Sequence, residues 1–97
     1  DENAKFTMSE IAKSEFSLQV DLVLLAMGFI HVEHNRLLSH LGVEYDPMGN
    51  VKTDDNFMSS VPGVFSAGDA KKGASLVVHA IFQGRQAAAA IDKYLKK

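Results

Sequence analysis

A short apolar segment that ends in Gly68-Asp69 is the part of this sequence best suited to bind a ligand. Val64-Phe65-Ser66-Ala67 predicts a short strand. Gly68 has no side chain, so the backbone can approach a ligand closely at that point. Asp69 then follows the carboxyl end of the strand, which is where open α/β sheets bind their ligands. Its carboxylate can accept hydrogen bonds from the hydroxyl groups of a sugar or sugar alcohol, each worth about 1.5–3 kcal/mol.

A long helix is predicted shortly after this aspartate, and its first turn is the second candidate ligand contact. Apolar residues recur at helical spacing from Leu76 to Leu95, and Ser75 is suited to be the N-cap residue. Leu76, Val77 and Val78 would form the first turn, and none of these side chains competes for the free amides there. Because the positive end of the helix dipole lies behind them, these amides can face an electron-rich ligand edge.

Other polar residues support weaker hypotheses. His31 and His34 are three residues apart, but no third ligand has suitable spacing, which favours a surface pair over a metal site. Asp54-Asp55-Asn56 lacks the spacing of an EF-hand loop and indicates a solvated turn. His79 could be a catalytic base, although a partly buried structural histidine is the favoured interpretation. Arg85 could contact a ligand phosphate or be an ordinary surface cation, and the sequence leaves both open.

The composition is that of an ordinary globular chain, with 46% hydrophobic and 23% charged residues among 97. Since cysteine is absent, these residues cannot form a disulfide scaffold, a thiolate zinc site or a cysteine-ligated iron–sulfur cluster. A net charge of −2 predicts no nucleic-acid partner. The longest apolar run is too short to span a membrane, and no signal-peptide pattern is present. We therefore expect a cytoplasmic protein, and the start at Asp1 favours a piece of a longer chain.

A β-hairpin and one further strand are predicted in the amino-terminal part. Phe16 to Val20 alternates apolar and polar residues, and together with Phe6-Thr7-Met8 this pattern predicts a β-hairpin. Leu22 to Met27 is a continuous apolar run that ends at Gly28. Such a run predicts a strand covered on both faces, as in parallel sheets.

The middle of the chain is mixed. Leucines at helical spacing between Glu33 and Leu41 predict a short helix that stops at Gly42. Asp46 to Asn50 is rich in turn residues and predicts a short hairpin or an open turn, and Ser59 to Gly63 predicts a second turn.

Three separated blocks resemble one protein family, in the same order along the chain. Ser60 to Asp69 resembles the second FAD-binding motif of the two-dinucleotide-domain flavoprotein reductases. Ser75 to Ile81, followed by Gly84 to Ala88, is similar to the helix that caps the isoalloxazine ring in glutamate synthase small subunits. Asp21 to Phe29 resembles the strand by which that subunit returns from its NADPH domain to its FAD domain. The resemblance extends from about Glu15 to Lys97.

This resemblance implies an α/β fold: the C-terminal half of a Rossmann-like FAD-binding domain, with a leading β-hairpin and a long C-terminal helix. Residues 1–20 would be a hairpin from the end of the NAD(P)H domain, and residues 21–97 the C-terminal part of the FAD-binding domain. It also implies that Asp69 holds the ribityl chain of FAD, beside Gly68, where the backbone can approach the cofactor closely. The amides of Leu76, Val77 and Val78 would face the flavin ring.

The resemblance further implies a parent protein that passes hydride from NADPH to FAD. Electrons would then cross iron–sulfur clusters to a glutamate synthase large subunit that forms glutamate. NADPH and the clusters would be bound by parts outside this sequence, which has neither a GxGxxG fingerprint nor a cysteine. Two alternatives remain open: a related FAD and NAD(P)H reductase subunit with another electron acceptor, and a non-enzymatic interaction module. No residue is expected to act as an acid–base catalyst, and the choice between NADPH and NADH is left open.

The apolar run predicts self-association of the 97-residue chain. Leu22 to Met27 lacks neighbouring strands in this sequence, and an uncovered apolar sheet edge pairs readily with a second chain. We expect a two-fold dimer that buries this strand or the Val77–Ile81–Ala88 face of the last helix. Light scattering over a concentration series measures the mass directly. A monomeric mass at high concentration, with a cooperative melt, would contradict this expectation.

Overall fold

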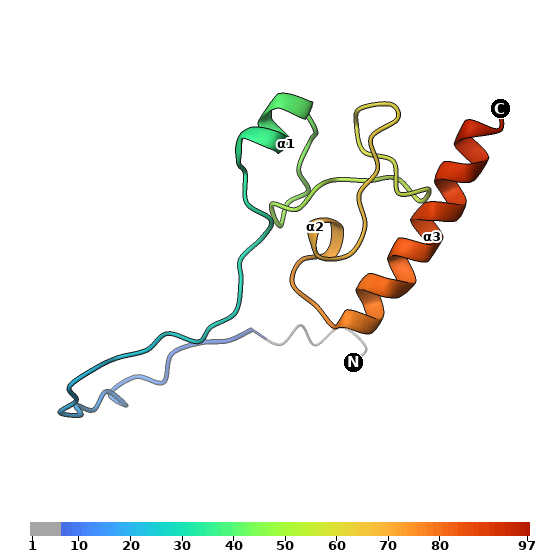
Figure 1. Cartoon of the computed structure of the whole chain (residues 1–97). Coiled ribbons are helices and arrows are strands. Elements are labelled where there is room, and N and C mark those ends of the chain that lie inside the picture. Colours follow the sequence, from blue (N-terminus) through green and yellow to red (C-terminus); the bar gives the residue numbers. More distant parts are fainter. Residues whose placement is uncertain (1–6) are drawn as a thin grey trace.

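The structure, a computed structural model, describes residues 7–97 and contains three helices in that range. α1 spans Arg36–Leu41, α2 spans Asp69–Lys72 and α3 spans Val77–Leu95. Figure 1 shows α2 at the centre of the body, with α3 along one side of it. Within the described residues, β structure is limited to isolated antiparallel bridges rather than continuous strands.

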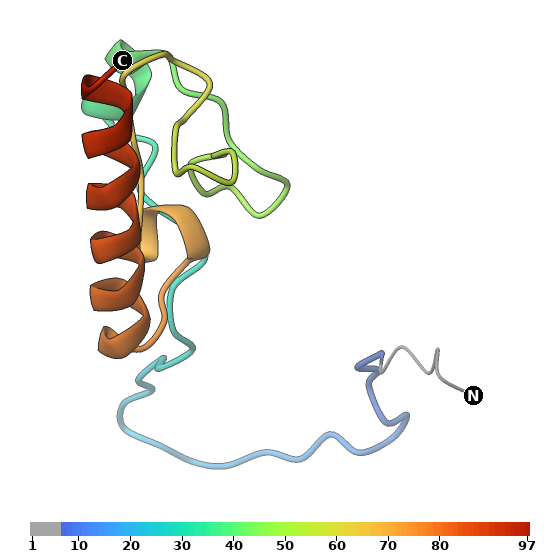
Figure 2. The same cartoon turned by 90° about the vertical axis from the view of Figure 1, so that its right-hand side faces the viewer.

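Residues 7–30 form an extended arm without helix or strand. Figures 1 and 2 show this arm leaving the body as a long open arc. Its apolar side chains are exposed: Leu24 is 81% exposed and Met27 83%. The radius of gyration is accordingly 19.1 Å, well above the roughly 13 Å of a compact chain of 100 residues.

The predicted strand at Leu22 to Met27 is therefore not formed. A parallel strand obtains its backbone hydrogen bonds entirely from neighbouring strands, and no other segment of residues 7–97 offers one. The leading β-hairpin is likewise not confirmed, because Phe16 to Val20 has no paired partner within the described range. Phe6, which belongs to the first half of that predicted hairpin, lies outside the described residues.

Two turns of the same construction build the middle of the chain. In the first, the Asp46 carboxylate accepts hydrogen bonds from the amides of Met48 and Asn50, at 2.8 and 3.0 Å. In the second, the Asp54 carboxylate accepts from the amides of Asn56 and Met58, at 2.8 and 2.9 Å. These side-chain contacts are those of an Asx turn. The predicted turns at both aspartates are confirmed, and the Asp54 carboxylate stabilises its own turn.

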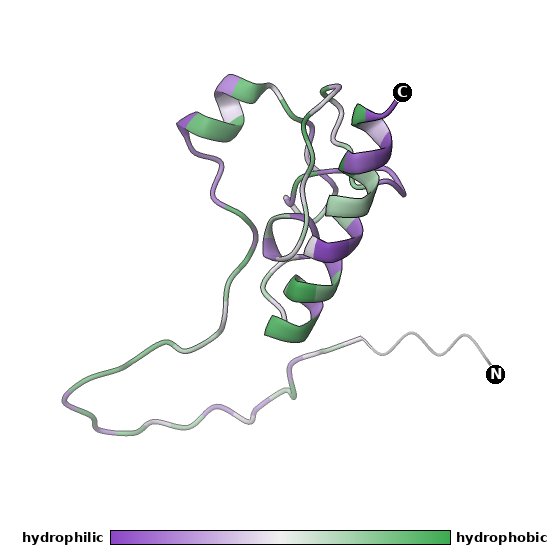
Figure 3. Ribbon diagram, turned by 45° about the vertical axis from the view of Figure 1, so that its right-hand side comes forward, coloured by the Kyte–Doolittle hydropathy of each residue, from purple (hydrophilic) through white to green (hydrophobic). Residues whose placement is uncertain are grey.

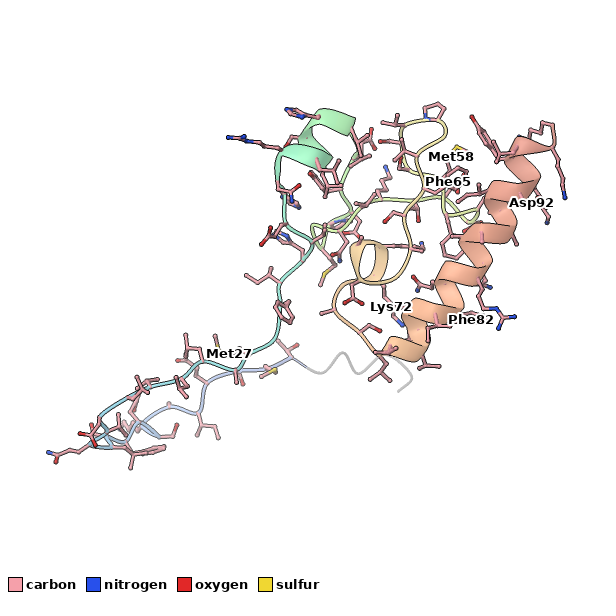
Figure 4. The ribbon with its side chains drawn as sticks, viewed as in Figure 1. Met27, Met58, Phe65, Lys72, Phe82 and Asp92 are labelled. Carbon is pink, nitrogen blue, oxygen red and sulfur yellow. The ribbon has the colours of Figure 1, made fainter. Side chains whose placement is uncertain are left out.

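Antiparallel bridges close these turns into a small meander. Tyr45 pairs with Val51, Thr53 with Ser59, and Met58 with Phe65. The last pair places Met58 beside Phe65 on the side of the meander that faces α3 (Figure 4). The predicted strand at Val64 to Ala67 is thus present only as this single bridge.

The buried centre of the described residues is small. It consists of Val43, Asn50, Val51 and Ala87. Asn50 is only 3% exposed, and its side-chain oxygen accepts a hydrogen bond from the Val32 amide at 3.2 Å. A buried polar side chain needs such a partner, so Asn50 ties the end of the arm to the meander.

Three aromatic rings strengthen the same connection. The rings of His31 and His34 stack with centroids 4.3 Å apart, and the ring of His34 stacks on Tyr45 at 3.8 Å. His34 also contacts the Gly49 carbonyl through Nε2 at 2.7 Å. The two histidines therefore hold residues 31–34 against the first turn, which supports the predicted surface pair.

The helix boundaries follow the predicted stop signals more closely than the start signals. α1 ends at Gly42, whose φ of 70° is the left-handed conformation expected of a glycine at that position. Its start is three residues later than the Glu33 limit of the predicted segment. α3 has 19 residues, and its position agrees with the predicted helix.

The face of α3 that packs on the body differs from the predicted apolar face. Ala87 is buried, and the half-buried residues lie on the same side: Ala80, Gln83, Ala90, Ile91 and Tyr94. By contrast Val77 is 74% exposed and Ile81 61%. Figure 3 shows this apolar character at the first turns of α3 and along the extended arm. Small alanine side chains allow the body to approach one side of α3, while the larger apolar residues remain on its surface.

Gly49 provides a test of the connection between the arm and the meander. Its φ is +87°, and a Cβ atom added there would lie 2.6 Å from Cδ2 of His31. We expect Gly49→Ala to lower the free energy of unfolding by about 2–3 kcal/mol, from left-handed strain and a disturbed ring stack. Urea denaturation of the 97-residue chain measures this.

Gly63→Ala is the matched control. Gly63 has a similar φ of +82°, but its added Cβ would meet nothing closer than the Tyr94 hydroxyl at 3.6 Å. Gly63→Ala should therefore lower the free energy of unfolding only by the cost of the left-handed strain. Equal destabilisation by the two substitutions would show that the ring stack contributes nothing.

Candidate functional site

Gly68 occupies the junction between the meander and the two helices that follow it. Its backbone has φ 65° and ψ −141°, a combination that favours glycine. Its carbonyl accepts hydrogen bonds from the amides of Lys71 and Lys72, at 3.1 and 2.9 Å, and so begins α2. A Cβ atom at this position would lie 3.5 Å from that of Ala80, so the junction rests directly on α3.

Asp69 is the first residue of α2, and its carboxylate is exposed. It makes no hydrogen bond or ion pair with any other residue in the range 7–97. The side chain borders an open hollow of about 210 Å³, which is lined by Phe29, His31, Val32, Asp69, Ala70 and Ala74. A carboxylate without a protein partner at the edge of a hollow retains its full capacity to accept hydrogen bonds from a ligand.

α2 is fastened to the meander on its other side. The Ala70 carbonyl accepts a hydrogen bond from the Val51 amide at 2.8 Å. The Lys71 ammonium donates to the hydroxyl of Thr53 at 2.7 Å and lies 5.3 Å from the ring centre of Phe57. Lys71 is therefore held against the meander rather than extended into solvent. These contacts fix the orientation of the short helix that carries Asp69.

The amino-terminal end of α3 differs by one residue from the prediction. Leu76, not Ser75, is the N-cap residue, with extended φ and ψ of −75° and 146°. The Ser75 hydroxyl is instead 2.7 Å from Nδ1 of His79, and the Lys72 ammonium is 3.2 Å from the same nitrogen. Figure 4 shows Lys72 extending from α2 toward the first turns of α3. His79 thus joins the two helices, in agreement with the favoured structural role.

The first amides of α3 are free within the described residues. The amides of His79 and Ala80 donate to the Leu76 carbonyl, at 3.0 and 3.2 Å. Those of Val77 and Val78 precede the first intrahelical bond and find no other acceptor in residues 7–97. Of the predicted contacts in this turn, Leu76 therefore contributes the N-cap position, while Val77 and Val78 contribute the free amides.

The structure does not place Asp69 and the first turn of α3 in one hollow. Val78 borders a separate apolar hollow of about 540 Å³, shared with Ile81, Phe82, Arg85, Gln86 and Ala89. Phe82 marks this face of α3 in Figure 4. Arg85 forms no ion pair within the described range, so its charge is free there. The two candidate contacts are linked only through Gly68, Lys72 and the body of α3.

Three residues of this region, Phe29, His31 and Gln83, were absent from the predicted site. Phe29 and His31 line the hollow beside Asp69, and Gln83 accepts a hydrogen bond from the Gly68 amide at 2.9 Å. Gln83 follows Ala80 by three residues, so both lie on the face of α3 that meets the junction. The spacing of three residues between Ala80 and Gln83 was the sequence signal that could have identified Gln83. The position of Phe29 and His31 depends on how the arm joins the body, and local sequence does not encode it.

Residues 7–97 contain neither a cluster of metal-ligating side chains nor a helix suited to cross a membrane. In the range 7–97, no group of three histidine, cysteine, aspartate or glutamate side chains could hold a metal ion. The helices of the same range do not combine the length and apolarity that crossing a bilayer requires.

Known proteins resemble this chain over most of its length. The family model of the pyridine nucleotide-disulphide oxidoreductases matches residues 1–84. A relative named glutamate synthase [NADPH] small chain, from Mycobacterium tuberculosis, is 55% identical over 86 residues, which is 89% of this chain and 18% of the relative. The small chain of Azospirillum brasilense is 38% identical over 97 residues, 99% of this chain and 20% of that relative. A glutamate synthase [NADH] of Schizosaccharomyces pombe is 40% identical over 89 residues, 91% of this chain and 4% of that relative.

These matches confirm the resemblance found in the sequence. They also support a Rossmann-like class for the intact domain, although residues 7–97 contain almost no β structure. The chain spans about a fifth of the length of the small-chain relatives. Because the family model covers most of the sequence, the chain belongs to the pyridine nucleotide-disulphide oxidoreductase family.

Proposed function

We propose that this chain is the C-terminal part of a longer glutamate synthase small subunit, called the parent below, and that it supplies one side of the parent's FAD site. The observation that carries the proposal is the Asp69 carboxylate, exposed at the edge of a hollow and without a partner in the described residues. The relatives named glutamate synthase small chain support the choice of parent.

The residues present fit the sugar-alcohol part of FAD. A ribityl chain carries hydroxyl groups, which are hydrogen-bond donors, and Asp69 offers carboxylate oxygens that only accept. Gly68 keeps the approach to this carboxylate free of a side chain, while its contact with Ala80 holds the turn in place. The hollow beside Asp69 is open, as a site completed by other parts of a parent would be.

The first turn of α3 fits the other end of the same cofactor. The free amides of Val77 and Val78 are donors, and the positive end of a 19-residue helix lies behind them. These donors suit the pyrimidine edge of a flavin, which becomes electron-rich when the ring is reduced. Leu76 fixes the start of the helix through its carbonyl, which accepts the first intrahelical bonds.

FAD, when bound, supplies the capacity to accept hydride from a reduced pyridine nucleotide and to release electrons one at a time. In the proposal, Asp69 orients the ribityl chain, and the amides of Val77 and Val78 stabilise negative charge on the ring. No acid–base step is assigned to this chain, since His79 is held by Ser75 and Lys72.

The remaining components of the reaction belong to other parts of the parent and its assembly. NADPH would bind outside these residues, as would the iron–sulfur clusters, because this sequence has no cysteine ligands for them. A large subunit would receive the electrons and form glutamate in the cytoplasm. NADPH is favoured over NADH by the names of the bacterial small-chain relatives.

Asp69 is the residue whose replacement tests this function. In the parent, Asp69→Ala should weaken FAD binding by about 1.5–3 kcal/mol, roughly ten- to a hundred-fold, because charge-assisted hydrogen bonds are lost. Flavin fluorescence during titration of the apoprotein measures the dissociation constant. Asp55→Ala, which removes an exposed carboxylate from a turn, is the control and should bind FAD normally. Full flavin content of Asp69→Ala at limiting FAD would remove Asp69 from the site.

The 97-residue chain alone should carry no stoichiometric FAD. Its candidate contacts cover the ribityl chain and one ring edge, whereas the glycine-rich loop that binds pyrophosphate is not among these residues. After gel filtration, absorbance between about 350 and 500 nm, where flavin absorbs, reports the cofactor content. About one flavin per chain would show that these residues form a complete site.

A further inference from the structure

We infer that Gln83 is a positioning residue for the FAD site: its side-chain oxygen holds Gly68 on α3 and thereby sets where the Asp69 carboxylate lies relative to the free amides of α3. The inference rests on the proposed function, and it adds a residue to which neither the sequence motif nor the family match assigns a role.

The central contact joins two segments that are distant in sequence. The Gly68 amide donates to the side-chain oxygen of Gln83 at 2.9 Å, and the contact is partly buried. Gly68 is the residue before α2, so its amide is not used by that helix. Without Gln83 this donor would have no acceptor in residues 7–97, and an unsatisfied donor away from water is costly.

Packing restricts the same junction. A Cβ atom at Gly68 would lie 3.5 Å from the Cβ and 3.6 Å from the Cα of Ala80, which is ordinary contact distance. Ala80 and Gln83 are both half-buried, and they lie one helical turn apart on α3. Ala80 therefore sets how closely Gly68 approaches the helix, while Gln83 sets its orientation.

The position of Asp69 depends on that of Gly68, because the two residues are joined through the backbone. The Gly68 carbonyl accepts the amides of Lys71 and Lys72, so a change in φ or ψ at Gly68 would turn the whole of α2 relative to α3. Asp69 is the first residue of that helix. The segment between α2 and α3 is short, and the contact between Lys72 and His79 closes it at the opposite end. Gln83 and His79 together thus fix α2 against the start of α3.

The chemistry of the hydrogen bond shows which substitutions of Gln83 test its role. The contact needs only an acceptor at the end of a side chain of this length. Glutamate supplies one, leucine has a similar size and supplies none, and alanine leaves space for water. Lys93 is also a long polar side chain of α3, is exposed, borders neither hollow of the candidate site and makes no hydrogen bond or ion pair in the described range, so Lys93→Leu is the matched control.

The experiment measures FAD affinity of the parent apoprotein by fluorescence titration, together with its melting temperature without FAD. Gln83→Leu should raise the dissociation constant roughly ten-fold, with a smaller rise for Gln83→Ala. Gln83→Glu should restore the affinity, and Lys93→Leu should leave it unchanged. The visible circular dichroism of bound flavin should change in the leucine variant and recover in the glutamate variant. If the leucine variant does not fold, the comparison of alanine with glutamate decides.

The hydrogen bond between Gly68 and Gln83 can be tested separately in the 97-residue chain. Hydrogen exchange of the Gly68 amide, followed by nuclear magnetic resonance, should accelerate in Gln83→Ala and stay slow in Gln83→Glu. Unchanged exchange would overturn the contact itself.

The outcomes separate this inference from the function on which it rests. If Asp69→Ala weakens FAD binding but the leucine and alanine variants of Gln83 do not, the inference fails and the proposed function stands. If the Gln83 variants lower only the melting temperature, Gln83 is merely structural and the inference again fails. If neither Asp69 nor Gln83 variants change FAD affinity, the proposed function fails.

Discussion

The backbone conformation of Gly68 is the constraint on which the arrangement of the site depends. Its positive φ turns the chain from the meander into α2, its carbonyl begins that helix, and its amide is bound by a side chain of α3. The positive φ favours glycine at this position, and the backbone lies close enough to α3 that an added Cβ atom would meet Ala80 at 3.5 Å, an ordinary contact distance. Meander, α2 and α3 therefore meet at one residue, and the carboxylate that follows it is exposed and has no partner among residues 7–97.

The stability of this junction contrasts with the openness of the rest of the chain. Hydrogen bonds of side chains and turns organise residues 31–76: two aspartates close turns, Asn50 holds the arm, and Lys71 holds α2. The hydrophobic contribution is small, because the buried apolar residues among those described are limited to Val43, Val51 and Ala87. Large apolar side chains instead remain exposed on the arm and on one face of α3. In an intact FAD domain such surfaces would pack against further strands, and their burial would add about 25 cal/mol for each Å² of apolar area.

Local signals in the sequence predicted those features that are determined locally. The glycine stop of α1, the extent of α3 and the turns at Asp46 and Asp54 depend on neighbouring residues, and all were anticipated. The strand at Leu22 to Met27 was not formed, because pairing requires a neighbouring strand that residues 7–97 do not contain. The apolar periodicity of α3 also misidentified the face that contacts the body. Alanines carry little weight in such a pattern, yet their small size is what permits close packing at Ala80 and Ala87.

In the candidate site too, local sequence predicted some features, while others depend on contacts between distant segments. The Gly68-Asp69 motif and the amides of Val77 and Val78 could be identified from residue type and order alone. The relation between them could not, since it depends on Gln83, Ala80 and the contact of Lys72 with His79, none of which has a motif of its own. A ligand that touches both groups must bridge two separate hollows. Under the proposed function the cofactor is an extended molecule, with a sugar-alcohol chain that would meet Asp69 and an electron-rich ring that would meet the first turn of α3.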